Sequence, residues 1–226
     1  MENEHIVRRF DKNLEKIKSK TLEMGELVGA QVRDATAMWI NHDADEVARI
    51  VALDLRVNGL HREVYERAEI LIARRQPVAS DLRRTLAPIN IAGELERIGD
   101  HAKSAARRAF VFSRNRPDQK LFDTIVKMSS IVQVMLSEVL IAYDHSNIGQ
   151  AAEVRMQDRE IDALHQAVLK LVISALANVS GDEELVAGYV HLVLISRNLE
   201  RVGDHIVNIS RYVNQIVEGD DLKARE

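Results

Sequence analysis

Hydrophobic positions recur along most of the chain at the three- and four-residue spacing of an amphipathic helix, most clearly from Ile50 to Leu71 and from Ile91 to Ala105. Polar or proline-containing segments interrupt this pattern at 41–45, 75–77, 113–118, 144–147 and 180–182. The pattern predicts six helices, at about residues 5–40, 45–75, 79–112, 119–143, 148–179 and 182–217. Helices of this length with one apolar stripe are stable when they pack side by side, so we expect an all-α, elongated bundle with short antiparallel connections.

A seven-residue motif occurs twice in the chain. Residues 95–101 read LERIGDH and residues 199–205 read LERVGDH, at an offset of 104 residues. The same offset, without a gap, relates Asp54 to Asp158 and His61 to His165. The repeat predicts a duplicated three-helix bundle, with a first unit at 1–114, a second at 115–218 and a frayed tail at 219–226.

Composition narrows the class of protein and of site. The 226 residues are 46% hydrophobic and 4% aromatic with three prolines, which argues against disorder and against a strand-rich fold. The net charge of −4 opposes nucleic-acid binding. Cysteine is absent, so any metal must be held by oxygen or imidazole. A charged N-terminus and the lack of ~18 uninterrupted apolar residues predict a cytoplasmic protein without a membrane span.

Oxygen-bearing side chains occur in i, i+4 pairs, and therefore on one helix face, in the second and third predicted helices of each repeat. The pairs are Asp54 and Asn58, Glu96 and Asp100, Asp158 and Asp162, and Glu200 and Asp204. Folding each helix pair about Pro77 or Gly181 places the four side chains of a repeat at one height, roughly 30 Å from the turn. A bound cation would offset the repulsion between these acids, and such ligands suit Mg²⁺, Mn²⁺, Ca²⁺ or iron better than copper or structural zinc.

Further side chains near these pairs can contribute to a metal site. The histidines one turn or one residue away are His61, His101, His165 and His205. Asp34 and Glu138, related by the repeat offset, can add an oxygen from the first helix of each repeat. The structural alternative is a solvated acidic face in which Arg97 and Arg201 each neutralise one acid.

Two other features have more than one explanation. Gly99 and Gly203, inside predicted helices, indicate either the close approach of a neighbouring helix or clearance beside the acids. The arginine pairs at 74–75 and 83–84 flank the Pro77 turn, where they are either solvated or form a local basic contact.

The segment RQPVASDLR at 75–83, followed by the two E-R-x-G-D motifs, resembles the PhoU family of bacterial accessory proteins of phosphate-specific transport. The resemblance covers nearly the whole chain. It implies two three-helix bundles, a cytoplasmic homodimer, and multinuclear metal clusters at the paired motifs, with Fe, Mn, Mg and Zn all open as the metal. Asn58 departs from the acidic pattern and leaves the first repeat with three carboxylates.

The same resemblance implies negative regulation of the phosphate-starvation response. The implied partners are the ATPase subunit of the phosphate ABC transporter and a membrane sensor histidine kinase. The leading hypothesis is therefore a non-enzymatic, metal-binding adaptor. The alternatives are a carboxylate-bridged di-metal enzyme, for which no Glu-x-x-His motif completes either cluster, and a structural bundle without metal.

Overall fold

The computed structural model describes the whole chain except residues 1, 42–43, 112–118, 178, 180 and 220–226. The described part consists of six α-helices and contains no strand, which confirms the predicted all-α class. The helices are α1 (Glu2–Asn41), α2 (Ala44–Arg75), α3 (Ala79–Val111), α4 (Gln119–His145), α5 (Ile148–Leu176) and α6 (Glu183–Glu218). Each helix begins and ends within three residues of its predicted bounds.

Local side-chain chemistry explains where several helices begin and end. Asn147 caps α5, because its side-chain oxygen accepts a hydrogen bond from the Gln150 amide at 3.2 Å. Asp182 caps α6 in the same way through the Leu185 amide at 2.9 Å. Gly219 follows α6 with a φ of 71°, a left-handed conformation that glycine adopts without steric cost.

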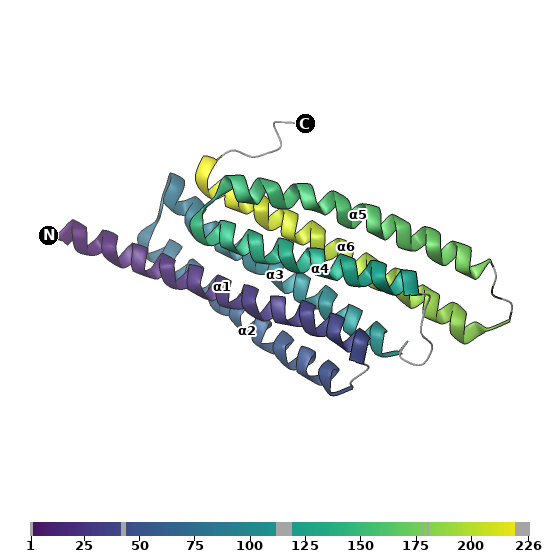
Figure 1. The fold of residues 1–226 in the computed structure, drawn as a ribbon. Coiled ribbons are helices and arrows are strands. Elements are labelled where there is room, and N and C mark those ends of the chain that lie inside the picture. The colour runs from purple at the N-terminus through teal and green to yellow at the C-terminus, as the bar shows by residue number, and fades with distance from the viewer. Residues whose placement is uncertain (1, 42–43, 112–118, 178, 180, 220–226) are drawn as a thin grey trace.

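The six long helices form two groups of three that lie side by side (Figure 1). Within each group the three helices pack against one another, and between the groups α3 packs along α6 and α1 contacts α4. This arrangement confirms the duplicated three-helix bundle. The predicted boundary between residues 114 and 115 lies outside the described residues. The same is true of all of the predicted tail, 219–226, except Gly219.

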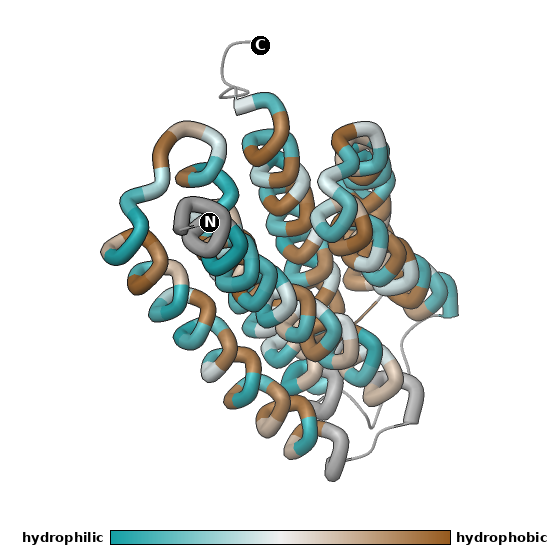
Figure 2. Tube along the Cα trace, turned by 90° about the vertical axis from the view of Figure 1, so that its left-hand side faces the viewer, coloured by the Kyte–Doolittle hydropathy of each residue, from teal (hydrophilic) through white to brown (hydrophobic). Residues whose placement is uncertain are grey.

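Both repeats contribute to one hydrophobic core. Met24 of α1, Leu95 of α3, Met135 of α4 and Ile206 of α6 are all fully buried in it. Apolar and polar segments follow each other at short intervals along the helices in view in Figure 2, as expected where an apolar stripe runs along one face of a helix. Each buried side chain of this size stabilises the fold by roughly 1.5–3 kcal/mol. Because side chains of both repeats pack in the same core, each repeat contributes to the stability of the other.

Helix α4 is the only helix in the described part that is long and apolar enough to cross a membrane. Its inner face packs into the core through side chains that include Met128, Met135 and Tyr143. A buried helix of a soluble bundle meets the same length and composition criteria, so the lack of a membrane span stays a prediction.

Candidate metal centre

Three acids of the second repeat lie close enough to Asp158 to influence its charge. Asp158 and Asp162 project from α5, and Glu200 and Asp204 project from α6. Burial is the largest influence on Asp158, and together with the negative charges of the other three acids it raises the pKa of Asp158 to about 6. No cation forms an ion pair with these four acids within the described part of the chain. Arg211 of α6 lowers the pKa of Asp158 but does not outweigh burial and the other acids, so the cluster keeps an excess of negative charge.

Gly203 provides the space that the Asp158 carboxylate occupies. A Cβ atom at position 203 would lie 2.5 Å from Oδ1 of Asp158, closer than real side chains allow. Gly203 is itself buried in the middle of α6, where glycine costs roughly 1 kcal/mol relative to alanine. In this repeat the glycine is thus explained by clearance beside the acids.

In the first repeat, one lysine bridges two of the three acids. Lys103 on α3 donates from Nζ to Oδ2 of Asp54 on α2 and to Oδ1 of Asp100, each at 2.7 Å. Burial, the largest influence, lowers the pKa of Lys103, but the bonds to Asp100 and Asp54 outweigh it, so the pKa of Lys103 lies above its ordinary value. The repeat offset places Val207 at the equivalent position, so the second repeat has no matching cation.

The other two side chains of the predicted first-repeat set differ from the two aspartates in their polar contacts. Asn58 is exposed on α2 and Glu96 is half-buried on α3. Neither side chain makes a hydrogen bond or an ion pair with any described residue. The predicted role of Arg97 is wrong in this repeat, because its guanidinium lies 3.9 Å from Glu94 and Lys103 pairs with Asp100 in its place.

The two additional oxygen donors predicted from the first helix of each repeat differ in their environment. Asp34 is half-buried on α1. Glu138 on α4 accepts a hydrogen bond from Nε2 of Gln157 at 2.6 Å, so this carboxylate is already partnered by an amide of α5.

Gly99 has a different explanation from its counterpart in the second repeat. A Cβ atom there would lie 2.7 Å from Oε1 of Gln31, a fully buried side chain of α1. Nε2 of Gln31 donates to the Ile50 carbonyl at 3.2 Å, which fixes the amide between α1 and α2. The close approach of a neighbouring helix therefore accounts for Gly99.

Three of the four histidines near the acids hold the bundle together. The rings of His101 and His205 stack between α3 and α6, with centroids 5.4 Å apart and an interplanar angle of 21°. Nδ1 of His205 lies 2.6 Å from Oε2 of Glu94, and Nδ1 of His101 lies 3.2 Å from Oδ1 of Asn198. Because the repeat offset also relates Glu94 to Asn198, these are equivalent bonds, one from each repeat, across a pseudo-symmetric interface.

The environment of this interface affects its titratable groups. Burial raises the pKa of Glu94, but hydrogen bonds from His205 and Asn208 outweigh burial and hold the pKa below its ordinary value. Burial also lowers the pKa of His101.

The other two histidines near the acids lie outside this interface. Nδ1 of His165 on α5 lies 2.9 Å from the Ser196 hydroxyl of α6, and His61 is half-buried on α2.

The two repeats differ in the carboxylates that are available to bind a metal ion. Among the described residues, no group of three or more histidine or acidic side chains is arranged as a preformed ligand set. The second repeat nevertheless offers four carboxylates that form no ion pair within the described part of the chain, and carboxylates are the donor type that hard divalent cations select. The first repeat offers acids that an internal ammonium group already bridges.

Both repeats of the chain match a known protein domain. The PhoU domain pattern matches residues 21–109 and 125–213, and the second match follows the first by the same offset of 104 residues. A protein of Caulobacter vibrioides (strain NA1000 / CB15N), named phosphate-specific transport system accessory protein PhoU homolog, is 33% identical over 98% of this chain and 95% of its own length.

Two solved structures share the fold. The crystal structure of PhoU from Pseudomonas aeruginosa superposes with a TM-score of 0.87 at 31% identity, covering 93% of this chain and all of that one. A regulatory protein of the phosphate transport system, PhoU from Streptococcus pneumoniae, superposes with a TM-score of 0.85 at 24% identity, which supports the fold. The family consists of regulatory accessory proteins and not of enzymes. With both repeats matched and relatives aligned along nearly its whole length, the chain belongs to the PhoU family.

Proposed function

We propose that this protein is a non-enzymatic, metal-binding regulator of phosphate uptake and a negative regulator of the phosphate-starvation response. The observation that carries this proposal is the match of both repeats to the PhoU domain, together with relatives that are named accessory proteins of a phosphate-specific transport system. In this proposal the protein works in the cytoplasm as a homodimer. It links the ATPase subunit of the phosphate ABC transporter to a membrane sensor histidine kinase.

The proposed metal site is the acidic cluster of the second repeat, formed by Asp158, Asp162, Glu200 and Asp204. Two observations support it: the four acids form no ion pair in the described part of the chain, and the glycine at position 203 admits the Asp158 carboxylate. Fe, Mn, Mg and Zn stay open as the metal, and oxygen donors favour the harder ions. A divalent cation bound there would offset part of the negative charge of the cluster.

The first-repeat set, Asp54, Asn58, Glu96 and Asp100, is proposed as the weaker site. Lys103 already supplies a positive charge between two of its carboxylates, and Asn58 contributes no charge. A cation must displace the ammonium group before it can bind both aspartates. The alternative of a carboxylate-bridged di-metal enzyme finds no support in the family comparisons.

A reporter of the phosphate-starvation response tests the regulatory role. In a strain without this gene, we expect the reporter to be active at high phosphate, and we expect the wild-type gene to restore repression. A Glu200→Ala/Asp204→Ala variant present at the wild-type level should fail to restore it. A reporter that stays silent without the gene would refute the regulatory role, whereas full repression by the double variant would refute only the role of the metal.

A further inference from the structure

A groove with a strongly basic lining runs between the first half of α1 and the last half of α2. Its volume is about 360 Å³, within the range of small-molecule sites. Ile17 and Leu71, both buried, form its floor. Five cationic side chains line it: Arg9, Lys16, Arg67, Arg74 and Arg75. The concentration of positive charge contrasts with the net charge of −4 of the chain.

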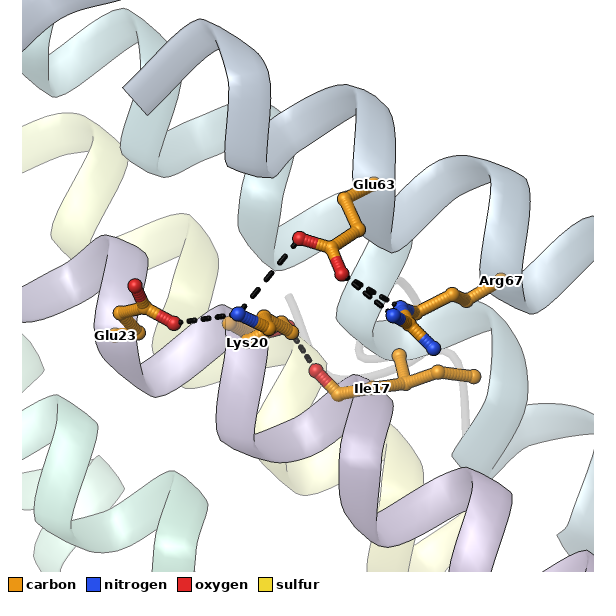
Figure 3. Close-up of polar contacts among 6 residues, drawn as sticks. Ile17, Lys20, Glu23, Glu63 and Arg67 are labelled. Carbon is orange, nitrogen blue, oxygen red and sulfur yellow. Dashed lines mark hydrogen bonds and ion pairs between the residues drawn. The ribbon is translucent and has the colours of Figure 1, made fainter. Parts of the chain in front are cut away.

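Of the five cations, Arg67 is the one that pairs with an acid in the described part of the chain. Arg67 donates from Nε and Nη2 to Oε1 of Glu63, at 2.9 and 2.6 Å. Figure 3 shows that Glu63 also faces Lys20 of α1, which in turn pairs with Glu23, so this network at the edge of the groove is balanced within itself. The other four cations form no ion pair with any acid in the described part of the chain.

The helix dipole explains the positions of only some of the cations that line the groove. Arg74 and Arg75 lie in the last turn of α2, where cations interact favourably with the helix dipole. Arg9 and Lys16 lie in the first half of α1, where that explanation does not apply. They nevertheless face the same groove as the arginines of α2.

The duplication provides an internal comparison. The repeat offset relates Arg9, Arg74 and Arg75 to Ser113, Asn178 and Val179, none of which is charged. Lys16 alone keeps a cation, Lys120, at the equivalent position. The basic groove is therefore a property of the first repeat and not of the three-helix unit as such.

We propose that this groove binds a compact polyphosphate anion, either inorganic polyphosphate or the triphosphate of a nucleotide. Guanidinium groups donate two parallel hydrogen bonds to the oxygens of phosphate and of carboxylate groups, so the charge that fits into the groove distinguishes these anions. An isolated phosphate group carries about 1.5 to 2 negative charges near neutral pH, so two or three joined groups are needed to balance four cations. A chain of that length is small enough for the groove, whereas carboxylates with the same total charge need a larger molecule.

Calorimetric titration of the full chain with tripolyphosphate, in metal-free buffer at about 50 mM salt, tests the proposal directly. We expect saturable binding that weakens at least tenfold in an Arg74→Ala/Arg75→Ala variant. The matched control is Arg56→Ala/Arg62→Ala, which removes two exposed arginines of the same helix that do not line the groove. The control should bind as the wild type does, and circular dichroism should show that both variants are folded.

Further ligands distinguish the sources of the anion. ATP binding at least as tightly as tripolyphosphate would support a nucleotide, with Ile70, half of whose surface is exposed, available to the base. Tighter tripolyphosphate binding would support inorganic polyphosphate. Inorganic phosphate and citrate should each bind at least tenfold more weakly than the better of these two ligands.

Several results would overturn the proposal. Equal loss of affinity in the control variant would indicate a general charge effect, and equal affinity for citrate would remove the selectivity for phosphate. Absence of binding to both tripolyphosphate and ATP would refute the site. If vesicles with anionic lipids then bound in an Arg74- and Arg75-dependent way, the groove would be a membrane contact.

Discussion

Replacing Asp158 with asparagine is expected to stabilise the metal-free protein near neutral pH. Asparagine has nearly the same shape as aspartate and fits over Gly203, but it removes one negative charge from the cluster. The pKa of Asp158 is raised from 3.8 to about 6 because burial and three neighbouring acids disfavour its charged form. The charged carboxylate thus opposes folding until a cation offsets it.

The sign and size of the effect follow from the pKa values of the folded and unfolded states. Below pH 3.8 the carboxyl group is protonated in both states, and above about pH 6 it is charged in both. Between these values the folded state binds more protons, so wild-type stability falls as the pH rises through this window. The difference in pKa corresponds to roughly 3 kcal/mol. Solvent screening of this partly exposed group reduces the effect to about 1 kcal/mol.

Urea unfolding in the presence of a chelator, followed by circular dichroism from pH 4 to pH 8, measures this difference. The Asp158→Asn variant should be more stable than the wild type by about 1 kcal/mol at pH 7.5 and no more stable near pH 4. Glu66→Gln, at an exposed position of α2, is the control and should show no such pH-dependent gain. A variant that is less stable than the wild type at pH 7.5 would refute the reasoning.

Two further substitutions test the difference between the repeats. Lys103→Met leaves two aspartates without their counter-charge, so the metal-free protein should lose about 1 kcal/mol and calorimetry should detect additional Mn²⁺ binding in the first repeat. An unchanged stoichiometry would show that the lysine does not exclude metal. Gly203→Ala should displace the Asp158 carboxylate and weaken Mn²⁺ binding at least tenfold, whereas Gly93→Ala, where a Cβ meets no atom within 4 Å, should not. Equal affinity in the two glycine variants would contradict the clearance role of Gly203.

The helices were predictable because their signals are local. An apolar stripe repeats at helical spacing along each helix, and Asn147 and Asp182 are residue types that cap helix N-termini. The proximity of the acids in the second repeat follows from the same local geometry, since a helical hairpin brings positions equidistant from its turn to one height. No side-chain contact between helices had to be known for either inference.

The contacts of Lys103 and of the histidines could not be predicted in this way. The sequence shows Lys103 three residues after Asp100, but only the packing of α2 on α3 brings Asp54 to the same ammonium group. His101 follows Asp100 directly, and adjacent residues on a helix point about 100° apart, so His101 faces the other repeat. The bond between His205 and Glu94 likewise depends on how α3 packs along α6.

Titration of the metal-free protein with Mn²⁺ by calorimetry is the most direct test of the claim that the second-repeat acids hold the metal. The wild type should show a tight binding phase, and the Glu200→Ala/Asp204→Ala variant should lose it. A Glu66→Ala/Glu69→Ala variant, which removes two exposed acids of α2, should retain that phase. Binding by the Glu200/Asp204 variant that is as tight as that of the wild type would contradict the account, because the acidic cluster would then be only a solvated face.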